Sequence, residues 1–173
     1  LDTFMRLDSA AADAVMLLPD RRAAGAGVHD SLFGVVNPCK SAMGARLLES
    51  WLRQPLLDKA AIEARYDVVE LLRDEMTLRG ELTDALKNSP DLEVIIGRLR
   101  RKKSSLHDVY KLYCFVYKHL PRFLETLDGW TGDEAQVATL KSRFGSALKQ
   151  AQTDFAQFKA LVEYSLDFDV LPD

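Results

Sequence analysis

The sequence of 173 residues has little cysteine, proline or glycine and no long apolar run. Its two cysteines, Cys39 and Cys114, match no metal or redox spacing, so we expect reduced thiols packed as small hydrophobes. Six prolines and nine glycines leave room for long helices. No apolar run approaches the ~18 residues that span a bilayer, and none resembles a signal peptide. These absences favour a cytosolic or nuclear protein over a secreted or membrane protein.

Charge of one sign is also scarce, since the net charge is only −3. Such a chain has no global attraction for phosphate backbones, and a free-standing nucleic-acid module is usually more basic. The 47% of hydrophobic residues suffice for a core. The length fits one domain or one large segment of a bigger one. Because the chain opens at Leu1 rather than methionine, we expect an excised fragment.

Helical periodicity dominates what is present, and no convincing run alternates apolar and polar residues. We therefore predict an all-α fold, an irregular bundle of long and short helices with no significant sheet. Asp8, Ser41, Asp58 and Ser89 are the predicted caps, with Pro90 at the first helical position after Ser89. The expected helices cover about 9–18, 31–36, 42–53, 59–74, 75–87, 90–99, 105–120, 122–128, 134–144 and 146–166.

Several apolar stripes indicate which helix faces are buried. Gly44 is expected to let another backbone approach closely, and Pro121 to kink or end its helix. The segment at about 19–30, with no periodicity, is expected to be a mobile loop. The stripes are Met43, Leu47, Leu48, Trp51 and Leu52; Ile62, Tyr66, Val69 and Leu72; Leu92, Ile95, Ile96 and Leu99; Leu106 to Leu120; and Leu148, Phe155, Phe158, Val162 and Leu166.

Residues that carry chemistry are sparse. The three histidines are scattered, and no group of His, Cys, Asp or Glu has the spacing of a helical metal site. No serine lies in a tight glycine-flanked turn, and Gly25–Gly27 is too short for a phosphate loop. We therefore predict no catalytic, metal or cofactor-binding residue in this chain.

One charge cluster stands out, formed by Arg98, Arg100, Arg101, Lys102 and Lys103 at a predicted helix C-terminus. These side chains are candidate contacts for phosphate groups. The simpler interpretation is that cations favour a helix C-terminus, where carbonyl dipoles point outward. Three nearby tyrosines could stack on bases or pack in the core, and their helical spacing favours core packing. They are Tyr110, Tyr113 and Tyr117.

The run SLFGVVNPCKSAMGARLL at 31–48 resembles the signature opening of the core, or lever, domain of the MutS family of DNA mismatch repair proteins. The resemblance continues in pieces to Glu70, is preceded by MRLD at 5–8, and returns with PDLE at 90–93 and GRL at 97–99. It covers nearly the whole chain. The motif residues expected to be structural are Asn37, Cys39, Ser41, Gly44, Arg46, Leu47, Trp51, Pro55, Asp58, Arg65, Pro90, Asp91 and Leu92.

Finer features are similar to the eukaryotic branch of the family. NPCK at 37–40 is typical of eukaryotic versions, and LHDVYKLY at 106–113 resembles the subunit shared by both eukaryotic mismatch-recognition heterodimers. Met43-Gly44 is instead the pair common to bacterial members and other paralogues.

The resemblance implies that residues 1–173 are the first segment of the lever domain. The mismatch-binding, connector, clamp and ATPase domains would lie outside it, with ATP or ADP and Mg²⁺ bound in the ATPase domain. The whole protein would bind mismatched or looped duplex DNA as an ATP-dependent sliding clamp. It would pair with a second MutS-homologue subunit, recruit a MutL-type protein and act in the nucleus.

This segment itself would be no enzyme. It would pack on the clamp and ATPase domains and transmit displacement between them. Two alternatives remain, a stand-alone helical DNA-binding module that uses residues 98–103, and a generic protein-interaction scaffold.

Overall fold

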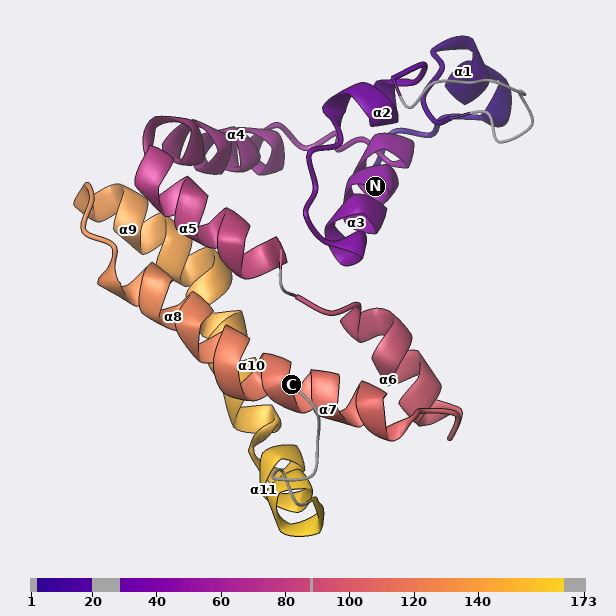
Figure 1. Ribbon diagram of the computed structural model, residues 1–173. Helices are drawn as coiled ribbons and strands as arrows, with labels where there is room; N and C mark the ends of the chain where they lie inside the picture. Colours follow the sequence, from indigo (N-terminus) through magenta and orange to yellow (C-terminus); the bar gives the residue numbers. More distant parts are fainter. Residues whose placement is uncertain (1–2, 20–28, 88, 167–173) are drawn as a thin grey trace. The chain divides into compact units, whose positions relative to one another are not determined.

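The computed structural model describes residues 3–19, 29–87 and 89–166, and nearly all of the regular structure in these ranges is helical (Figure 1). The predicted all-α class is confirmed, because the β structure of the described residues is one isolated bridge between Phe4 and Leu56. The expected mobile loop at 19–30 falls largely outside the described residues. The chain divides into two compact units, residues 1–70 and 71–173.

The first unit contains α1 (Ser9–Ala14), α2 (Leu32–Val36), α3 (Ala42–Arg53) and most of α4 (Lys59–Asp74). Each of the four begins at a polar cap, which satisfies backbone N–H groups that have no partner within the helix. Asp8 accepts from Ala11 N at 2.7 Å, and Ser41 accepts from Gly44 N at 3.2 Å. Asp58 accepts from Ala61 N at 3.0 Å. These three predicted caps are confirmed, and Ser31 caps α2 in the same way.

The predicted buried face of α4 is wrong for Tyr66 and Val69, whereas the predicted Ile62 and Leu72 are half-buried. Tyr66 and Val69 are 66% and 63% exposed, whereas Val68 and Leu71 are buried at 8% and 2%. Positions 64, 65, 68, 71 and 72 also satisfy helical spacing, so the sequence offers two neighbouring stripes that differ by about one residue step. Packing selects the second.

The apolar stripe of α3 is only partly covered, since Leu47 is 52% and Trp51 42% exposed. Gly44, in its first turn, has side chains as near neighbours. A Cβ there would lie 3.2 Å from Ser41 Oγ and 3.6 Å from Cys39 Cβ. The close backbone approach expected at Gly44 is therefore wrong, because the glycine makes room for the cap and its loop.

The second unit begins with the end of α4 and continues with α5 (Met76–Lys87) and α6 (Leu92–Arg100). A continuous helical run follows, made of α7 (Leu106–Cys114), η1 (Phe115–His119) and α8 (Leu120–Gly129). A second run contains α9 (Glu134–Leu140), η2 (Lys141–Gly145) and α10 (Ser146–Asp154), and α11 (Ala156–Ser165) closes the order. In Figure 1 the two runs lie alongside each other, with α8 in contact with α5, α10 and η2, and α11 in contact with α7.

Pro121 does not end its helix. The element η1, which ends two residues before Pro121, is a π-turn in which Leu120 N bonds to Phe115 O, five residues back. A wider turn relieves the clash that a proline ring makes in an α-helix, and π-turns of this kind occur where an extra residue is accommodated.

Two predicted boundaries in the second unit are wrong. Asp91, not Ser89, caps α6 by accepting from Val94 N at 3.2 Å. Ser89 instead donates its hydroxyl to Ala85 O of the preceding helix. The break expected near Gly145 is absent, because η2 carries the helix through that position, and the bend falls at Phe155 between α10 and α11.

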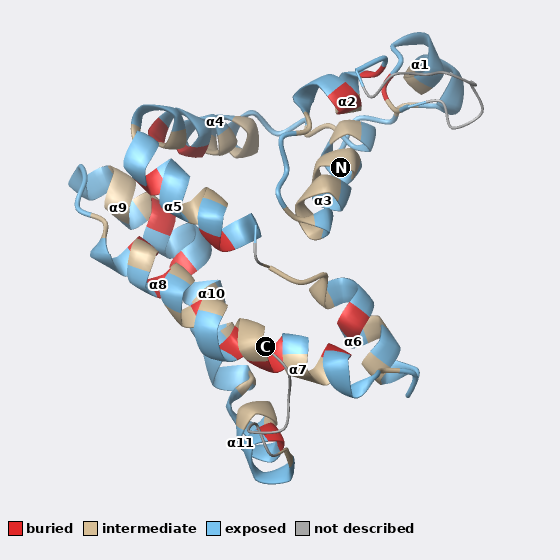
Figure 2. Ribbon diagram, viewed as in Figure 1, coloured by how far each residue is buried: buried red, intermediate tan, exposed pale blue. Residues whose placement is uncertain are grey.

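The core of the second unit is leucine-rich. Leu78 of α5, Leu120 of α8 and Leu140 of α9 are each no more than 2% exposed. A second cluster joins Ile95 of α6 to Leu112 and Val116. Figure 2 shows these buried positions as red patches along α5, α6 and α8. Partly buried side chains pack against the second cluster: Leu92, Leu99, Phe115, Phe155 and Phe158.

Candidate functional site

The basic cluster lies at the C-terminus of α6 and on the turn that leads to α7. Lys102 N donates to Leu99 O at 2.9 Å, and Lys103 N donates to Arg98 O at 2.9 Å. This pair of bonds, with Lys102 at φ 54°, is the Schellman arrangement that closes many helices. Glycine is the usual residue at that left-handed position, and lysine is strained there. The cations thus lie at the negative end of the α6 dipole, as the simpler interpretation predicts.

One cation of the cluster is held by the next helix. Arg98 Nη1 lies 2.9 Å from Asp108 Oδ1. Asp108 also accepts from Ser105 N at 3.1 Å, while Ser105 Oγ accepts from Asp108 N at 3.1 Å, which completes a capping box at the start of α7. The Ser105 backbone N–H and, after it, the Arg98 charge hold the pKa of Asp108 below its usual range. Sequence spacing did not predict this ion pair.

The other four cations of the cluster are exposed. These are Arg100, Arg101, Lys102 and Lys103, and none of them forms an ion pair with a described residue. We call these four side chains the basic turn. Such a group contacts phosphate oxygens without reading base sequence.

Of the three tyrosines predicted to pack in the core, Tyr113 is buried, Tyr110 is half-buried and Tyr117 is 49% exposed, so the prediction is wrong for Tyr117. Tyr113 is 8% exposed and donates its hydroxyl to Glu163 Oε1 at 3.0 Å. Burial, reinforced by the Glu163 hydrogen bond, raises the pKa of Tyr113 to about 12. The ring of Tyr117 stacks on Tyr113 at 5.6 Å, and Lys159 Nζ lies 4.7 Å from the Tyr117 ring centre. These contacts attach α11 to the long run.

A groove of about 530 Å³ separates α6 from α7 and η1. Its wall combines Arg98, His107 and Lys111 with Asp108 and the half-buried His119. Burial, together with the charges of Lys118 and Arg122, lowers the pKa of His119, so its imidazole is neutral near pH 7. The acids along the groove, Asp91 and Asp108, leave it only weakly cationic.

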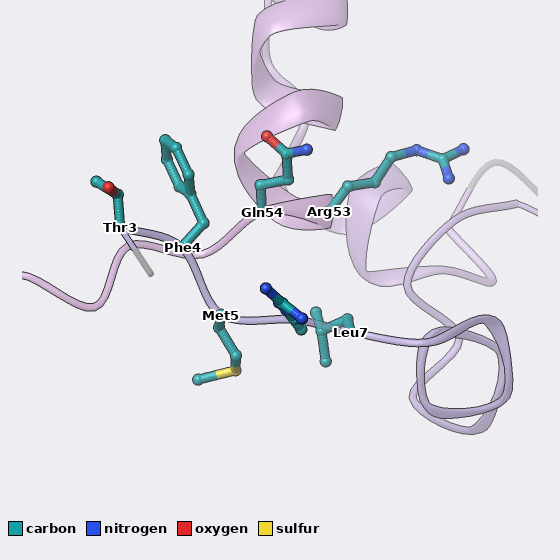
Figure 3. A pocket seen from close by; sticks show the side chains of 7 residues that line it. Thr3, Phe4, Met5, Leu7, Arg53 and Gln54 are labelled. Carbon is teal, nitrogen blue, oxygen red and sulfur yellow. The ribbon is translucent and has the colours of Figure 1, made fainter. Parts of the chain in front are cut away.

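The first unit holds a second cavity, of about 570 Å³, between residues 3–7 and the end of α3. The bridge between Phe4 and Leu56 and the bond from Met5 N to Pro55 O, at 2.8 Å, fix the two sides. Figure 3 shows Arg53 and Gln54 on one side and Thr3, Phe4, Met5 and Leu7 on the other. Arg53 is itself paired with Glu49 at 3.0 Å. No carboxylate lines this cavity among the described residues.

The motif residues have mainly structural roles. Ser41, Asp58 and Asp91 cap helices. Asn37 Oδ1 accepts from Cys39 N at 3.2 Å, which shapes the loop before α3.

Two further motif residues meet in space, since the Arg65 guanidinium lies 3.8 Å from the Trp51 ring centre. This cation–π contact joins α4 to α3, and the sequence pattern did not predict it.

Both cysteines are free thiols. Cys39 is exposed, so its expected packing as a small hydrophobe is wrong, while Cys114 is half-buried. In the described ranges no three His, Cys, Asp or Glu side chains are grouped to hold a metal ion. No described helix is long and apolar enough to cross a bilayer.

Comparison with known proteins decides the family. The family model described as MutS domain III matches residues 16–171. The chain belongs to the MutS domain III family. The resemblance predicted from the motif at 31–70 is therefore confirmed, because the match includes these residues.

The relatives of this domain III chain include eukaryotic and bacterial mismatch repair proteins. It is 36% identical to the DNA mismatch repair protein msh-2 of Neurospora crassa over 99% of the chain, and 36% identical to MSH2 of Arabidopsis thaliana over 97%. It is also 34% identical to MutS of Streptococcus gordonii over 72% of its length. The chain spans 18% of the length of the first two relatives and 15% of the third.

Proposed function

We propose that this chain is a lever segment of a DNA mismatch repair protein, which transmits displacement between a DNA-binding part and an ATPase part of the whole molecule. The observation that carries the proposal is the family match over residues 16–171. The relatives are named as mismatch repair proteins, and the chain corresponds to about a fifth of their length.

The helical runs of the second unit support a mechanical role. The run α7–η1–α8 extends from Leu106 to Gly129 without interruption, roughly 36 Å at 1.5 Å per residue. Buried leucines fix α8 against α5 and the second run, so bending the rod would expose apolar surface. An element of this kind passes on a displacement instead of absorbing it.

ATP or ADP and Mg²⁺ belong, in this proposal, to other parts of the full-length protein. The residues here do not fit them, since the sequence has no glycine-rich loop ending in Lys-Ser/Thr and the described residues hold no metal cluster. We also place a second MutS-homologue subunit, a MutL-type partner and a nuclear location with the full-length protein.

The test uses a full-length mismatch repair protein that carries this sequence as its domain III. Tyr110→Pro removes an N–H from the interior of α7 and pushes Val109 out of the α region. Tyr110→Ala is the matched control, because it removes the same ring and keeps the helix. We expect mismatch binding in both variants and slow ATP-induced release from mismatched DNA only in Tyr110→Pro. Wild-type release by a folded Tyr110→Pro protein would contradict the proposal.

A second candidate function, DNA-phosphate contact by the basic turn, is favoured by the exposure of its four cations. Its test is titration of the chain with duplex DNA at rising salt, comparing wild type with a variant in which Arg100 and Arg101 are replaced by Ala. We expect weak, salt-sensitive binding whose salt slope falls by about two in the variant. Equal slopes would exclude the basic turn as the contact.

A further inference from the structure

We propose that Ser104 is a phosphorylation site for an arginine-directed serine/threonine kinase, placed so that phosphorylation cancels about half of the positive charge of the basic turn. The four residues before Ser104 are Arg100, Arg101, Lys102 and Lys103, so an arginine lies three positions before the hydroxyl. Kinases select substrates by such charge patterns, and a kinase with an acidic substrate cleft complements this basic segment.

Ser104 is itself half-buried, so a kinase has to open the turn to reach its hydroxyl. Residues 103–105 have no regular structure, and the four cations before Ser104 are exposed. Drawing them into an extended shape breaks two backbone bonds, Lys102 N to Leu99 O and Lys103 N to Arg98 O. It also releases Lys102 from its left-handed conformation at φ 54°, which offsets part of that loss.

The neighbouring serine, Ser105, is more exposed than Ser104 but is a poorer acceptor because its polar groups are already bonded. Ser105 uses both its hydroxyl and its N–H in the capping box with Asp108, at 3.1 Å each. A phosphate on Ser105 would break the box and place negative charge beside the Asp108 carboxylate. Ser104 lies one residue outside the box, so its modification leaves the start of α7 intact.

Two other serines also follow an arginine by three residues, but their surroundings differ from those of Ser104. Ser9 follows Arg6 by three residues but comes directly after Asp8, an acid that an acidic cleft rejects. Ser146 follows Arg143 by three residues but lies inside the continuous run η2–α10, where its hydroxyl donates to Ser142 O. Ser9 and Ser146 therefore serve as internal controls for the effect of local structure and charge on phosphorylation.

The reaction is a phosphoryl transfer from ATP. Ser104 Oγ bonds to the γ-phosphorus while the bond from that phosphorus to the β,γ-bridging oxygen breaks. ADP leaves, and the hydroxyl proton passes to the base of the kinase. The product carries about two negative charges next to Arg101, Lys102 and Lys103, which cancels about half of the charge of the basic turn. Any effect on DNA rests on the second candidate function above.

The experiment incubates the full chain with MgATP and the catalytic domain of an arginine-directed serine/threonine kinase, and maps the phosphate by tandem mass spectrometry. Ser104→Ala, Ser105→Ala and Arg101→Ala are compared with the wild type, and thermal denaturation confirms that each is folded. We expect one phosphate on Ser104 in the wild type and in Ser105→Ala, and none at 104–105 in Ser104→Ala. The initial rate should fall at least tenfold in Arg101→Ala.

Phosphate chiefly on Ser105, Ser9 or Ser146, or an unchanged rate in Arg101→Ala, would overturn the proposal. A duplex-DNA titration of the phosphorylated chain tests the consequence separately. Several-fold weaker binding at low salt is expected. Unchanged affinity with Ser104 fully phosphorylated would reject the DNA consequence and leave the modification site supported.

Discussion

At the scale of single residues, Lys102 shows how local strain and chain geometry combine. The Schellman turn places a left-handed residue directly after α6, and this chain has lysine there at φ 54°. The turn delivers Ser105 and Asp108 to the start of α7 and brings Arg98 within 2.9 Å of Asp108. The strain is tolerated because the ion pair and the capping box determine the same geometry.

Lys102→Gly should therefore raise the free energy of unfolding by about 1 kcal/mol, since glycine carries no Cβ penalty in the left-handed region. Urea denaturation of the chain measures the change. Lys103→Gly is the matched control, because Lys103 is not among the described residues with positive φ. Loss of stability in Lys102→Gly would show that the lysine side chain contributes more than the backbone strain removes.

Tyr113 gives a pH-dependent test. Its pKa is raised from 10.0 to about 12, so its contribution to stability is complete below pH 10 and is lost as pH rises towards 12. Tyr113→Phe removes this titration. Between pH 10 and 12 we expect the free energy of unfolding of the variant to fall less than that of the wild type, with a difference on the order of 2 kcal/mol. Chemical denaturation at pH 9 and pH 11.5 measures the difference. Tyr164→Phe, at a ring that is 92% exposed, should behave like the wild type.

Residue-level prediction from sequence succeeded where the interaction is short-range. The predicted caps Asp8, Ser41 and Asp58 each accept from the backbone N–H three residues later, and the local chain geometry fixes that separation. Prediction failed for the ion pair between Arg98 and Asp108. The two residues meet across a turn that needs Lys102 in a left-handed conformation, which no sequence pattern predicts. Prediction also failed for Ser89 and Asp91, two equally good caps on either side of Pro90, because the choice depends on where α5 ends.

At the scale of elements, the capping box decides where the long run begins. Ser105→Ala removes the hydroxyl that accepts from Asp108 N and should cost about 1 kcal/mol of stability. Ser104→Ala, one residue earlier and outside the box, should change stability by less than about 0.5 kcal/mol. Urea midpoints of the two variants compare them directly. Equal losses would mean that Ser105 is not the cap in solution.

The leucine core of the second unit should hold its two helical runs together. Leu120→Ala, at a side chain that is 2% exposed, should lower the free energy of unfolding by about 2–5 kcal/mol. Leu161→Ala, at a side chain that is 62% exposed, should cost under about 1 kcal/mol. Thermal and urea unfolding provide the values. Similar losses would show that the burial pattern of this unit is wrong.

Helix existence was predictable, but helix faces and breaks were less so. On α4, two stripes one residue step apart fit the same spacing, and burial of Val68 and Leu71 rather than Tyr66 and Val69 depends on tertiary packing. Pro121 favours a helix end, yet the π-turn η1 absorbs the ring and the run continues. The glycine at 145 suggested a break that the second run does not have.

At the scale of the whole molecule, the all-α class and the family followed from the sequence, whereas the division into residues 1–70 and 71–173 did not. The boundary falls within α4, where the helical pattern continues without punctuation. The motif residues explain the contrast. Caps such as Ser41 and Asp58 specify local structure, and such residues indicate a fold without showing how its parts are divided.

The most direct test of the lever proposal is a distance measurement within the long run during nucleotide exchange. Spin labels at His107 and Glu125, both exposed, would lie roughly 27 Å apart along the helix axis in a full-length protein bound to mismatched DNA. We predict that this distance stays within about 2 Å when ADP is replaced by ATP and the protein leaves the mismatch, because a stiff lever moves as one body. A change of about 5 Å or more would show that the run bends during the transition and would contradict the account.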